Sequence, residues 1–510
     1  MLRLPPCYAR AYCSDSPVFV NRSGEQHETS PYTAGHSRRS PNLLVALALT
    51  SLALATLLAS LGTSVATVGL PALAEAFGAS FQAVQWVVLA YLLAISTLIV
   101  SVGRLGDLLG RRQLLLAGIL LFTLASVLCG LAPSLGLLIA GRTLQGLGAA
   151  VMMTLTLALV GETVDKDRTG RAMGLLATLS AVGTALGPSL GGTLVSAFGW
   201  HAIFLINVPL GLLTWLLAWH SLPTHRPQTS AARPGFDIPG TVLLATALGA
   251  YALAMTLGRG HFGGLNLALL LVAILGGGLF VMAQRRVTSP LIPLALFRDR
   301  LLVSGLATSA LVATVMMATL LVGPFYLSIS LGLPTALVGL VLAVGPCVAA
   351  LTGVPAGRLT DRFGVRPMRL VGLATMGLGC LMLTLVPPAL GMAGYIMAIV
   401  VTTLGYALFQ TANNTAVMAD IPAQKRGVIA GLLNLSRNLG FFTGAAVLGA
   451  IFASALPASG VSAASPEEVA NGLHFTFVVA LSMVVLALLI ALQYRAPEPL
   501  KDSQAAPGKG

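Results

Sequence analysis

The chain has 510 residues, of which 56% are hydrophobic and only 9% are charged, and its formal net charge is +13. So small a polar fraction cannot cover the surface of a soluble globule of this length. The composition therefore excludes an ordinary soluble domain and indicates an integral membrane protein.

A bilayer core about 30 Å thick needs roughly 20 apolar residues for each helical crossing. Long runs of Leu, Ala, Val and Gly favour helices over the other membrane-spanning structure, a closed β-barrel. In chain order we predict fourteen spans, near 43–67, 84–102, 114–132, 137–160, 172–198, 203–220, 238–257, 265–283, 301–329, 337–356, 370–387, 393–417, 428–453 and 474–492.

A charged decamer occurs twice between predicted spans. GRLGDLLGRR at 103–112 returns 254 residues later as GRLTDRFGVR at 357–366. Glycines downstream match at a nearly constant offset of 257: Gly174 with Gly431, Gly183 with Gly440, and Gly187 with Gly444. The duplication predicts two related six-helix halves, and the offset leaves room for two further helices between them.

The predicted organisation has five parts. In chain order these are a cytoplasmic tail at 1–42, a six-helix bundle at 43–220, two extra helices with linkers at 221–300, a second six-helix bundle at 301–494, and a cytoplasmic tail at 495–510. The first tail is polar and rich in Ser, Pro and Arg, which predicts disorder. The alternative is a misassigned start codon.

Lys and Arg follow the positive-inside rule if the amino terminus is cytoplasmic. The cytoplasmic loops then hold most of them, among them Arg111, Arg366 and Arg369, and the opposite loops hold only Arg259. Both termini are therefore expected in the cytoplasm. Nucleic-acid binding is disfavoured, because the basic residues are spread over many short loops.

The residue types of the decamer suit a conformational switch. Its glycines permit a tight turn, and Asp107 can accept hydrogen bonds at a helix end or pair with Arg111 or Arg112. Such a loop can join two helices in one conformation and release them in another. The alternative is a charged turn that only sets topology.

The decamer resembles the signature between the second and third helices of the major facilitator superfamily, and 357–366 resembles its second-half copy. The resemblance implies an all-α fold of two pseudosymmetric six-helix bundles plus two additional central helices, with alternating access to a midplane site. It also implies gating roles for Gly103, Asp107, Gly110, Arg111, Arg112, Asp361, Arg362 and Arg366.

The fourth span contains Gly141 to Gly148, which resembles the arginine-bearing motif of the same superfamily. A guanidinium such as that of Arg142 is costly inside a membrane and usually functional. By resemblance, Arg142 would influence proton transfer or substrate binding. The alternative is a side chain that extends to the membrane interface.

The fifth span contains Gly183 to Gly192, which resembles the motif of antiporters in the superfamily and implies export over uptake. Glycines four apart let a neighbouring helix approach closely, and a proline bends the helix. The motif residues are Gly183, Gly187, Pro188, Gly191 and Gly192. Trp200 to Gly211 then resembles the fourteen-span drug:proton antiporter family, as do Gln85, Trp86, Tyr91, Asn434, Arg437 and Gly440.

One departure from that family concerns the first span. Members that expel cationic drugs carry an acidic residue there, whereas this chain has Gly62 in its place and Thr67 in place of an asparagine. On the span map no acidic residue lies well inside a helix, so the deep ionisable residues are Arg142 and Arg437.

We therefore expect a neutral or anionic substrate attracted by Arg142, Arg437 or both. The expected polar wall is Gln85, Tyr91, Asn207, Tyr251, Tyr326 and Gln410. The alternative for each neutral residue is an interhelical hydrogen bond. For the coupling proton, candidates are Asp107, Glu162, Asp237 and Asp420, because partial desolvation raises the pKa of a carboxyl group.

The expected function is secondary active efflux of small hydrophobic compounds or drugs across the cytoplasmic (inner) membrane, driven by inward proton flow. The alternative is a dedicated exporter of one endogenous neutral or anionic metabolite. A membrane enzyme is less favoured, since the seven His are scattered. A channel is less favoured because repeated gating loops and proline-bent helices suit alternating access better. We expect no cofactor, metal or nucleic acid. The expected partners are a small-molecule substrate and membrane lipid, and a periplasmic adaptor stays open.

Overall fold

Every regular element of the described residues in the computed structural model is a helix. The structure describes residues 41–99, 101–164, 166–223, 237–257, 263–287, 294–387, 390–419, 426–457 and 464–493. All the predicted gating, coupling and antiporter-motif residues lie within these ranges. Both predicted tails lie outside them apart from residues 41 and 42, as does the proton candidate Asp420.

The helices of the first half are α1 (Pro41–Val68), α2 (Leu70–Ala76), α3 (Phe81–Leu98), α4 (Ser101–Leu109), α5 (Arg111–Gly130), α6 (Leu135–Thr163), α7 (Lys166–Phe198), α8 (Ala202–Leu205) and α9 (Asn207–Ser221). Two helices follow, α10 (Ile238–Thr256) and α11 (Gly264–Arg286). The second half contains η1 (Leu294–Arg298), α12 (Arg300–Phe325), η2 (Tyr326–Ser330), α13 (Thr335–Phe363), α14 (Val365–Leu385), α15 (Gly391–Met418), α16 (Arg426–Thr443), η4 (Gly444–Leu448), α17 (Gly449–Ser454) and α18 (Pro466–Gln493).

Thirteen helices or joined helices in the described ranges are long and apolar enough to cross a membrane. They occupy thirteen of the fourteen predicted positions, and α7, with 33 residues, occupies the other, between α6 and α9. The predicted all-helical membrane fold is confirmed, and the helix count is consistent with fourteen spans.

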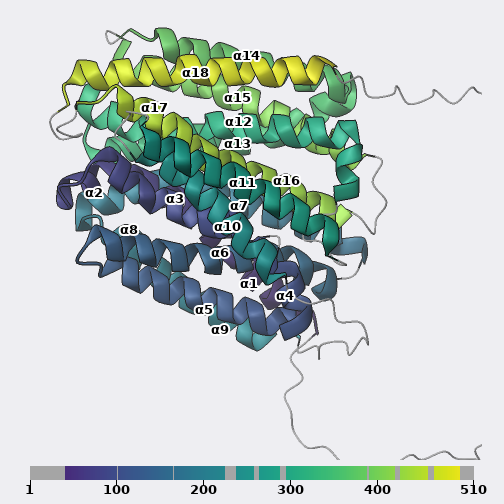
Figure 1. The fold of residues 1–510 in the computed structure, drawn as a ribbon. Helices are drawn as coiled ribbons and strands as arrows, with labels where there is room; N and C mark the ends of the chain where they lie inside the picture. The colour runs from purple at the N-terminus through teal and green to yellow at the C-terminus, as the bar shows by residue number, and fades with distance from the viewer. Residues whose placement is uncertain are drawn as a thin grey trace, which may run out of the picture. The chain divides into compact units, whose positions relative to one another are not determined.

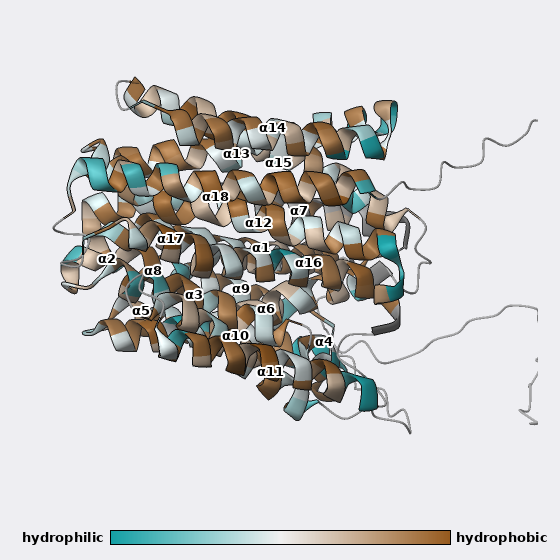
Figure 2. Ribbon diagram, turned by 45° about the horizontal axis from the view of Figure 1, so that its top comes forward, coloured by the Kyte–Doolittle hydropathy of each residue, from teal (hydrophilic) through white to brown (hydrophobic). Residues whose placement is uncertain are grey.

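The surface of the bundle is suited to lipid. Figure 2 shows hydrophobic residues along the lengths of the helices and hydrophilic ones mainly near their ends. On α11, Leu267 and Ile274 are each 70% exposed. Such continuous exposure of large apolar side chains would favour aggregation in water, whereas in a bilayer it costs nothing. We call helix ends on the side of the duplicated decamer inner, and the opposite ends outer.

The two halves meet along two matching pairs of helices. α3 packs against α16 and α17, and α13 packs against α7. α13 is the duplicate of α3, and α16 is the duplicate of α7. The contact of α3 with α16 is therefore equivalent to that of α13 with α7, as a pseudo-two-fold axis requires. In Figure 1, α5, α6 and α9 lie in one group and α14, α15 and α18 in another, with α7 and α16 between them.

The extra helix α10 is bonded to the first half near both of its ends. At its outer end Trp86 Nε1 donates to Thr256 Oγ1 at 3.1 Å, and at its inner end the hydroxyls of Ser101 and Thr241 lie 2.9 Å apart. α10 also touches η4 of the second half, and the ring of Tyr251 lies 6.1 Å from that of Phe442 on α16. Side chains thus bond α10 to the first half near both ends, and Tyr251, which also hydrogen-bonds with Thr443 of α16, joins it to the second half.

Asp237 holds α10 and α11 together. Its carboxylate caps α10 by accepting from the backbone N of Gly240 at 2.8 Å, and it accepts from Gln284 Nε2 of α11 at 2.6 Å. The side chain is buried. Since a buried carboxylate needs such donors, the structure accounts for this residue as a helix cap and crosslink.

The duplicated decamer has the same backbone conformation in both copies. Gly110 has a φ of 93° and its counterpart Gly364 a φ of 88°, and each directly precedes the next long helix. Residues with a side chain rarely adopt this left-handed region. The predicted tight turn is therefore present twice.

We expect Gly110→Ala and Gly364→Ala each to lower protein stability by roughly 1–2 kcal/mol, because a Cβ disfavours positive φ. Gly103→Ala and Gly357→Ala are the matched controls, since both residues are helical and a Cβ at either would have no neighbour within 4 Å. Thermal unfolding of the purified variants measures the difference. Equal melting of all four variants would show that the turn imposes no strain.

Candidate functional site

Arg142 is fully buried in the first half and makes three hydrogen bonds there. Its Nε donates to Val87 O at 2.8 Å on α3, and its two terminal nitrogens donate to Gln145 Oε1 at 2.6 Å on α6 and to Gly62 O at 3.1 Å on α1. One side chain thus joins three helices. Because it is sealed from solvent here, the alternative that it extends to the interface does not describe this conformation.

Aromatic rings complete the surroundings of Arg142. Its Cζ lies 4.1 Å from the centroid of the Tyr91 ring and 5.9 Å from that of Phe204. A ring face at this range attracts a cation. The Tyr91 hydroxyl donates to Ala59 O at 2.9 Å, so this residue of the predicted polar wall supports Arg142 and bonds α3 to α1.

Gly62 explains how α1 comes so close to Arg142. A methyl group at this position would lie 3.0 Å from the Tyr91 hydroxyl and 3.2 Å from the Phe122 ring. A larger side chain at position 62 would therefore meet Tyr91, whose ring lies against Arg142. In this chain, uncharged acceptors and aromatic rings surround the Arg142 cation.

Arg437, Gln410 and Asn207 each bond within their own helix. Arg437 is half-buried on α16 and donates to Asn434 Oδ1 at 3.0 Å, and Gln410 Nε2 lies 3.4 Å from Asn414 Oδ1 on α15. Asn207 is buried and donates to backbone carbonyls of its own helical segment. Arg437 is the more accessible of the two predicted deep arginines, so of the two it is better placed to meet a substrate in this conformation.

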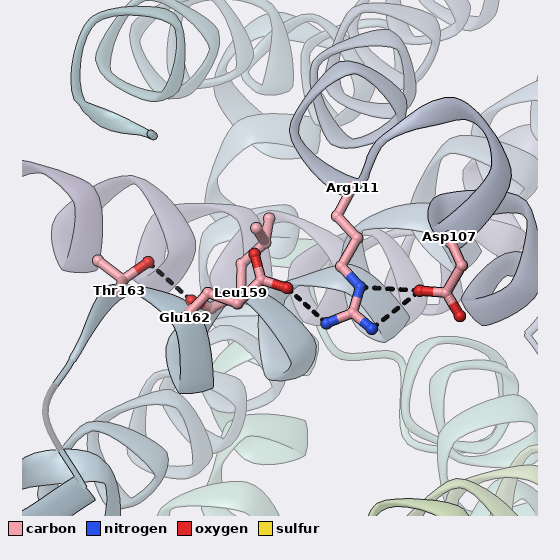
Figure 3. Close-up of polar contacts among 5 residues, drawn as sticks. All are labelled: Asp107, Arg111, Leu159, Glu162 and Thr163. Carbon is pink, nitrogen blue, oxygen red and sulfur yellow. Dashed lines mark hydrogen bonds and ion pairs between the residues drawn. The ribbon is translucent and has the colours of Figure 1, made fainter. Parts of the chain in front are cut away.

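The decamer of the first half contains an ion-pair cluster of Asp107, Arg111 and Glu162. Arg111 lies 2.8 Å from Asp107 Oδ1 and 2.6 Å from Glu162 Oε1 at the inner end of α6. Figure 3 shows the guanidinium between the two carboxylates. The Asp107 side chain is 60% exposed, so the pairs contribute little to stability. We call this set the Arg111 cluster.

Arg112 and Gly103 occupy other positions in the decamer. Arg112 donates to Trp219 O at 2.6 Å and lies over the Trp219 ring, so it attaches α5 to the inner end of α9. Gly103 lies on α4, half-buried. Of the two predicted partners of Asp107, the structure selects Arg111.

The second decamer does not repeat the Arg111 cluster. Val365 stands at the position that corresponds to Arg111, so Asp361 has no arginine four residues later. Asp361, Arg362 and Arg366 are exposed, and Arg362 lies 5.3 Å from the centroid of the neighbouring Phe363 ring. The turn is duplicated, whereas the ion-pair chemistry belongs to the first half.

The antiporter motif on α7 faces two helices at once. Methyl groups added at Gly183, Gly187 or Gly191 would overlap α1, and the one at Gly187 would meet the Ser64 hydroxyl. Pro188 and Gly192 approach α13 instead, where a methyl at Gly192 would lie 2.8 Å from the Cα of Gly339. The motif thus sets close packing inside the first half and between the halves. Gly440 and Gly444 make the corresponding approach of α16 to α12.

Gln85 connects the two halves. Its Nε2 donates to Ala445 O in η4, and a methyl at Gly449 would lie 3.0 Å from its Cδ. η4 is a π-helical turn, in which carbonyls lose their usual α-helical partners, so a side-chain amide can supply a donor. Gln85, predicted to line a substrate path, is therefore positioned as a contact between the halves.

Three phenylalanines lie at the outer ends of helices from both halves. Phe81 of α3 lies 5.0 Å, between ring centroids, from both Phe325 of α12 and Phe452 of α17. All three are fully buried. These rings therefore close the contact of α3 with α12 and α17 at the outer ends in this conformation.

Other predicted wall residues have aromatic neighbours. The rings of Tyr326 and Tyr395 lie 5.8 Å apart within the second half, and Tyr251 faces α16 as described above. Every acidic residue in the described ranges lies in a loop, in a short helix, or near the end of a long one. The absence of a deep carboxylate, expected from the span map, therefore holds for the described part of the chain.

The cluster of Phe81, Phe325 and Phe452 and the pairing of Glu162 with Arg111 could not be predicted from the sequence. The three phenylalanines are far apart in the chain, and no spacing links them. Glu162 gave a usable signal, because it is an acidic residue near the inner end of the span after the decamer. Only the packing of α5 on α6 shows its partner.

We expect Gln85→Leu to shift the carrier toward states with separated outer ends. Loss of one hydrogen bond of about 1 kcal/mol changes such an equilibrium about fivefold. Spin labels at the outer ends of α3 and α17 report the distance. Asn207→Leu is the matched control, because it removes a buried amide that bonds only its own helical segment. Unchanged distances in Gln85→Leu would contradict the assignment.

The model of the Major Facilitator Superfamily matches residues 52–445. The multidrug resistance protein Stp of Mycobacterium tuberculosis is 34% identical over 406 residues, which cover 78% of this chain and 73% of that protein. The riboflavin transporter RibZ of Clostridioides difficile is 30% identical over 399 residues, covering 78% and 86%. The crystal structure of a bacterial homologue of the lysosomal transporter Spinster superposes with a TM-score of 0.64 at 17% identity, covering 90% and 97%.

These comparisons confirm the resemblance to multidrug efflux members that the motifs indicated. The fold also matches known transporters across most of both chains, and this family and fold are not those of enzymes. The protein is an integral membrane transporter, and the chain belongs to the Major Facilitator Superfamily.

Proposed function

We propose that this transporter exports small hydrophobic compounds across the cytoplasmic membrane by proton antiport with alternating access. The observation that carries the proposal is the position of α7. Its glycines pack on α1 and its Pro188 and Gly192 pack on α13, so the motif that resembles the antiporter signature lies at a contact that must change when the halves rock. The name of the similar protein Stp, a multidrug resistance protein, supports export.

The substrate class follows from the charges around Arg142. The described part of the chain has no deep carboxylate to recognise a cation, and the position of the family's acid is occupied by Gly62, whose carbonyl accepts from Arg142. A cation would meet the positive potential of Arg142 without a compensating acid. We therefore propose neutral or anionic substrates, with Arg437 as the more accessible cationic contact.

The second candidate is export of one endogenous neutral or anionic metabolite. The similar protein RibZ is named a riboflavin transporter. Proteins similar to this chain therefore include one named for transport of a single metabolite. Discrimination requires a substrate panel that contains both drugs and polar metabolites. The proposed placement has both termini in the cytoplasm, and a periplasmic adaptor is an open partner.

The proposed inner gate is the Arg111 cluster. Exposed ion pairs contribute little to stability. We propose that their role is to favour one conformation, because Arg111 and Asp107 pair with different partners in each. With no deep acid in the described ranges, we propose that the coupling proton is carried at the inner ends of helices, where Asp107, Glu162 and Asp237 lie.

Transport by purified protein in vesicles tests substrate class and coupling together. Carriers inserted with their cytoplasmic face outward export into the vesicle lumen. When the lumen is made acidic, we expect these carriers to take up neutral and anionic compounds. Uptake should collapse when the pH gradient is dissipated. Empty vesicles are the control for passive entry. Transport confined to cations would overturn the argument from Gly62, and indifference to the gradient would remove proton coupling.

Asp107→Asn and Asp361→Asn form a matched pair, because the two residues hold equivalent positions in the duplicated decamer. We expect Asp107→Asn to reach the membrane normally and to lose transport about fivefold or more, since it loses the attraction to Arg111. Asp361→Asn should lose less, because Val365 offers no partner. Transport rates normalised to protein in the membrane decide this, and equal losses would contradict a gate specific to the first half.

A further inference from the structure

Arg369 is a second buried arginine with a different environment. It lies on α14, one turn from the inner end, and is only 5% exposed. Its one hydrogen bond to the described residues is weak, from a terminal nitrogen to Thr308 Oγ1 of α12 at 3.4 Å, and its buried Nε has no partner among them. The positive-inside pattern predicted a loop residue here, whereas the structure places it inside the second half.

The contrast with Arg142 shows what Arg369 lacks. Arg142 is fully buried and has two carbonyl oxygens, an amide oxygen and two ring faces around its charge. Arg369 has one hydroxyl oxygen at long range. Arginine stays protonated in proteins, so it cannot avoid the cost of burial by becoming neutral. A buried unpaired cation is strongly unfavourable, and this one needs an acceptor.

Further donors without partners lie on α12. The hydroxyls of Ser304 and Ser309 are buried and unpaired within the described part of the protein. The Thr308 hydroxyl already donates to Ser304 O at 2.7 Å, so toward Arg369 it can act only as an acceptor. Ser304 and Thr308 are one turn apart on the same face of α12, and Ser304 is the nearer to the inner end.

Asn413 of α15 approaches α12 from another helix. Its Nδ2 donates to Gly305 O at 3.1 Å, and its buried Oδ1 has no described partner. This acceptor lies beside Gly305, one position away from the face that carries Ser304 and Thr308. The unpaired groups on α12 itself are the hydroxyls of Ser304 and Ser309, which can donate to an anion.

The duplication does not require a charge at this position. Leu115, the residue that corresponds to Arg369 in the first half, is fully buried in the core. An apolar side chain is thus sufficient for packing of this helix, and the arginine is specific to the second half. No acidic side chain in the described ranges forms an ion pair with it.

We propose that Arg369 and Ser304 bind a small inorganic anion of the size of chloride between α12 and α14. The anion accepts from the Arg369 Nε and the Ser304 hydroxyl and neutralises the buried charge. Side chains of helices point toward the helix amino terminus, so the guanidinium is directed to the inner end, from which a cytoplasmic anion can enter. This site is independent of the proposed transport reaction.

Thermal unfolding of the full-length protein in nanodiscs of zwitterionic lipid tests the site. Gluconate, a much larger anion than chloride, replaces chloride at constant ionic strength. We expect about 100 mM chloride to raise the melting temperature of the wild type by roughly 3 °C, as a ligand bound only to the native state does. Arg369→Gln should show no such rise. Bromide should give an anomalous-scattering peak beside the Arg369 guanidinium in crystals.

Arg300→Gln is the matched control, since it removes an exposed cation at the inner end of α12 and should keep the full chloride response. Should Arg369→Gln fail to fold, Ser304→Ala provides the test, because loss of one donor of about 1 kcal/mol should weaken chloride binding about fivefold. An unchanged chloride response in Ser304→Ala would then overturn the proposal.

Three further results would overturn the proposal. One is a wild-type melting temperature indifferent to chloride. Another is an equal chloride response in Arg369→Gln. The third is stabilisation by anionic lipid but not by chloride, which would assign the counter-charge to a lipid phosphate. If the wild type does not respond to chloride and Asp420→Asn lowers the melting temperature, the counter-charge of Arg369 is the Asp420 carboxylate instead.

Discussion

Inside a bilayer, no bulk water pairs with polar groups, and this constraint organises the whole molecule. Helices satisfy their own backbones, and the few polar side chains that enter the interior bond helices together. Arg142 is the clearest case, because its guanidinium donates hydrogen bonds to acceptors on α1, α3 and α6. Asp237 does the same for α10 and α11. Close packing at glycines supplies the rest, since apolar surface gains nothing by leaving lipid.

The duplication explains the fold but not the chemistry. The turns at Gly110 and Gly364 and the contacts of α3 with α16 and of α13 with α7 are each made twice. Charges break the symmetry: among the described residues the Arg111 cluster has no counterpart in the second half, and Leu115 stands in the first half at the position of Arg369. The backbone turn is the same in both copies, whereas these charged side chains differ.

The extra helices add a further asymmetry. α10 bonds by side chains to the first half near both of its ends, and it meets the second half through Tyr251, which packs on Phe442 and hydrogen-bonds with Thr443. Two hydrogen bonds to the first half and one to the second make α10 a connection between the halves. Tyr251, expected on a polar wall, is thus engaged in that connection.

The sequence by itself determined the membrane class, the helix positions, the duplicated turn and the family, because hydropathy, glycine and charge act over short stretches of chain. It also indicated the lack of a deep acid. Tertiary structure decided which polar residues are sealed and which are accessible: Arg142 was placed in a closed network, Gln85 between the halves, Arg111 with Glu162, and Arg369 inside the bundle. Partners far apart in the chain have no spacing pattern, so only the packing of helices brings them together.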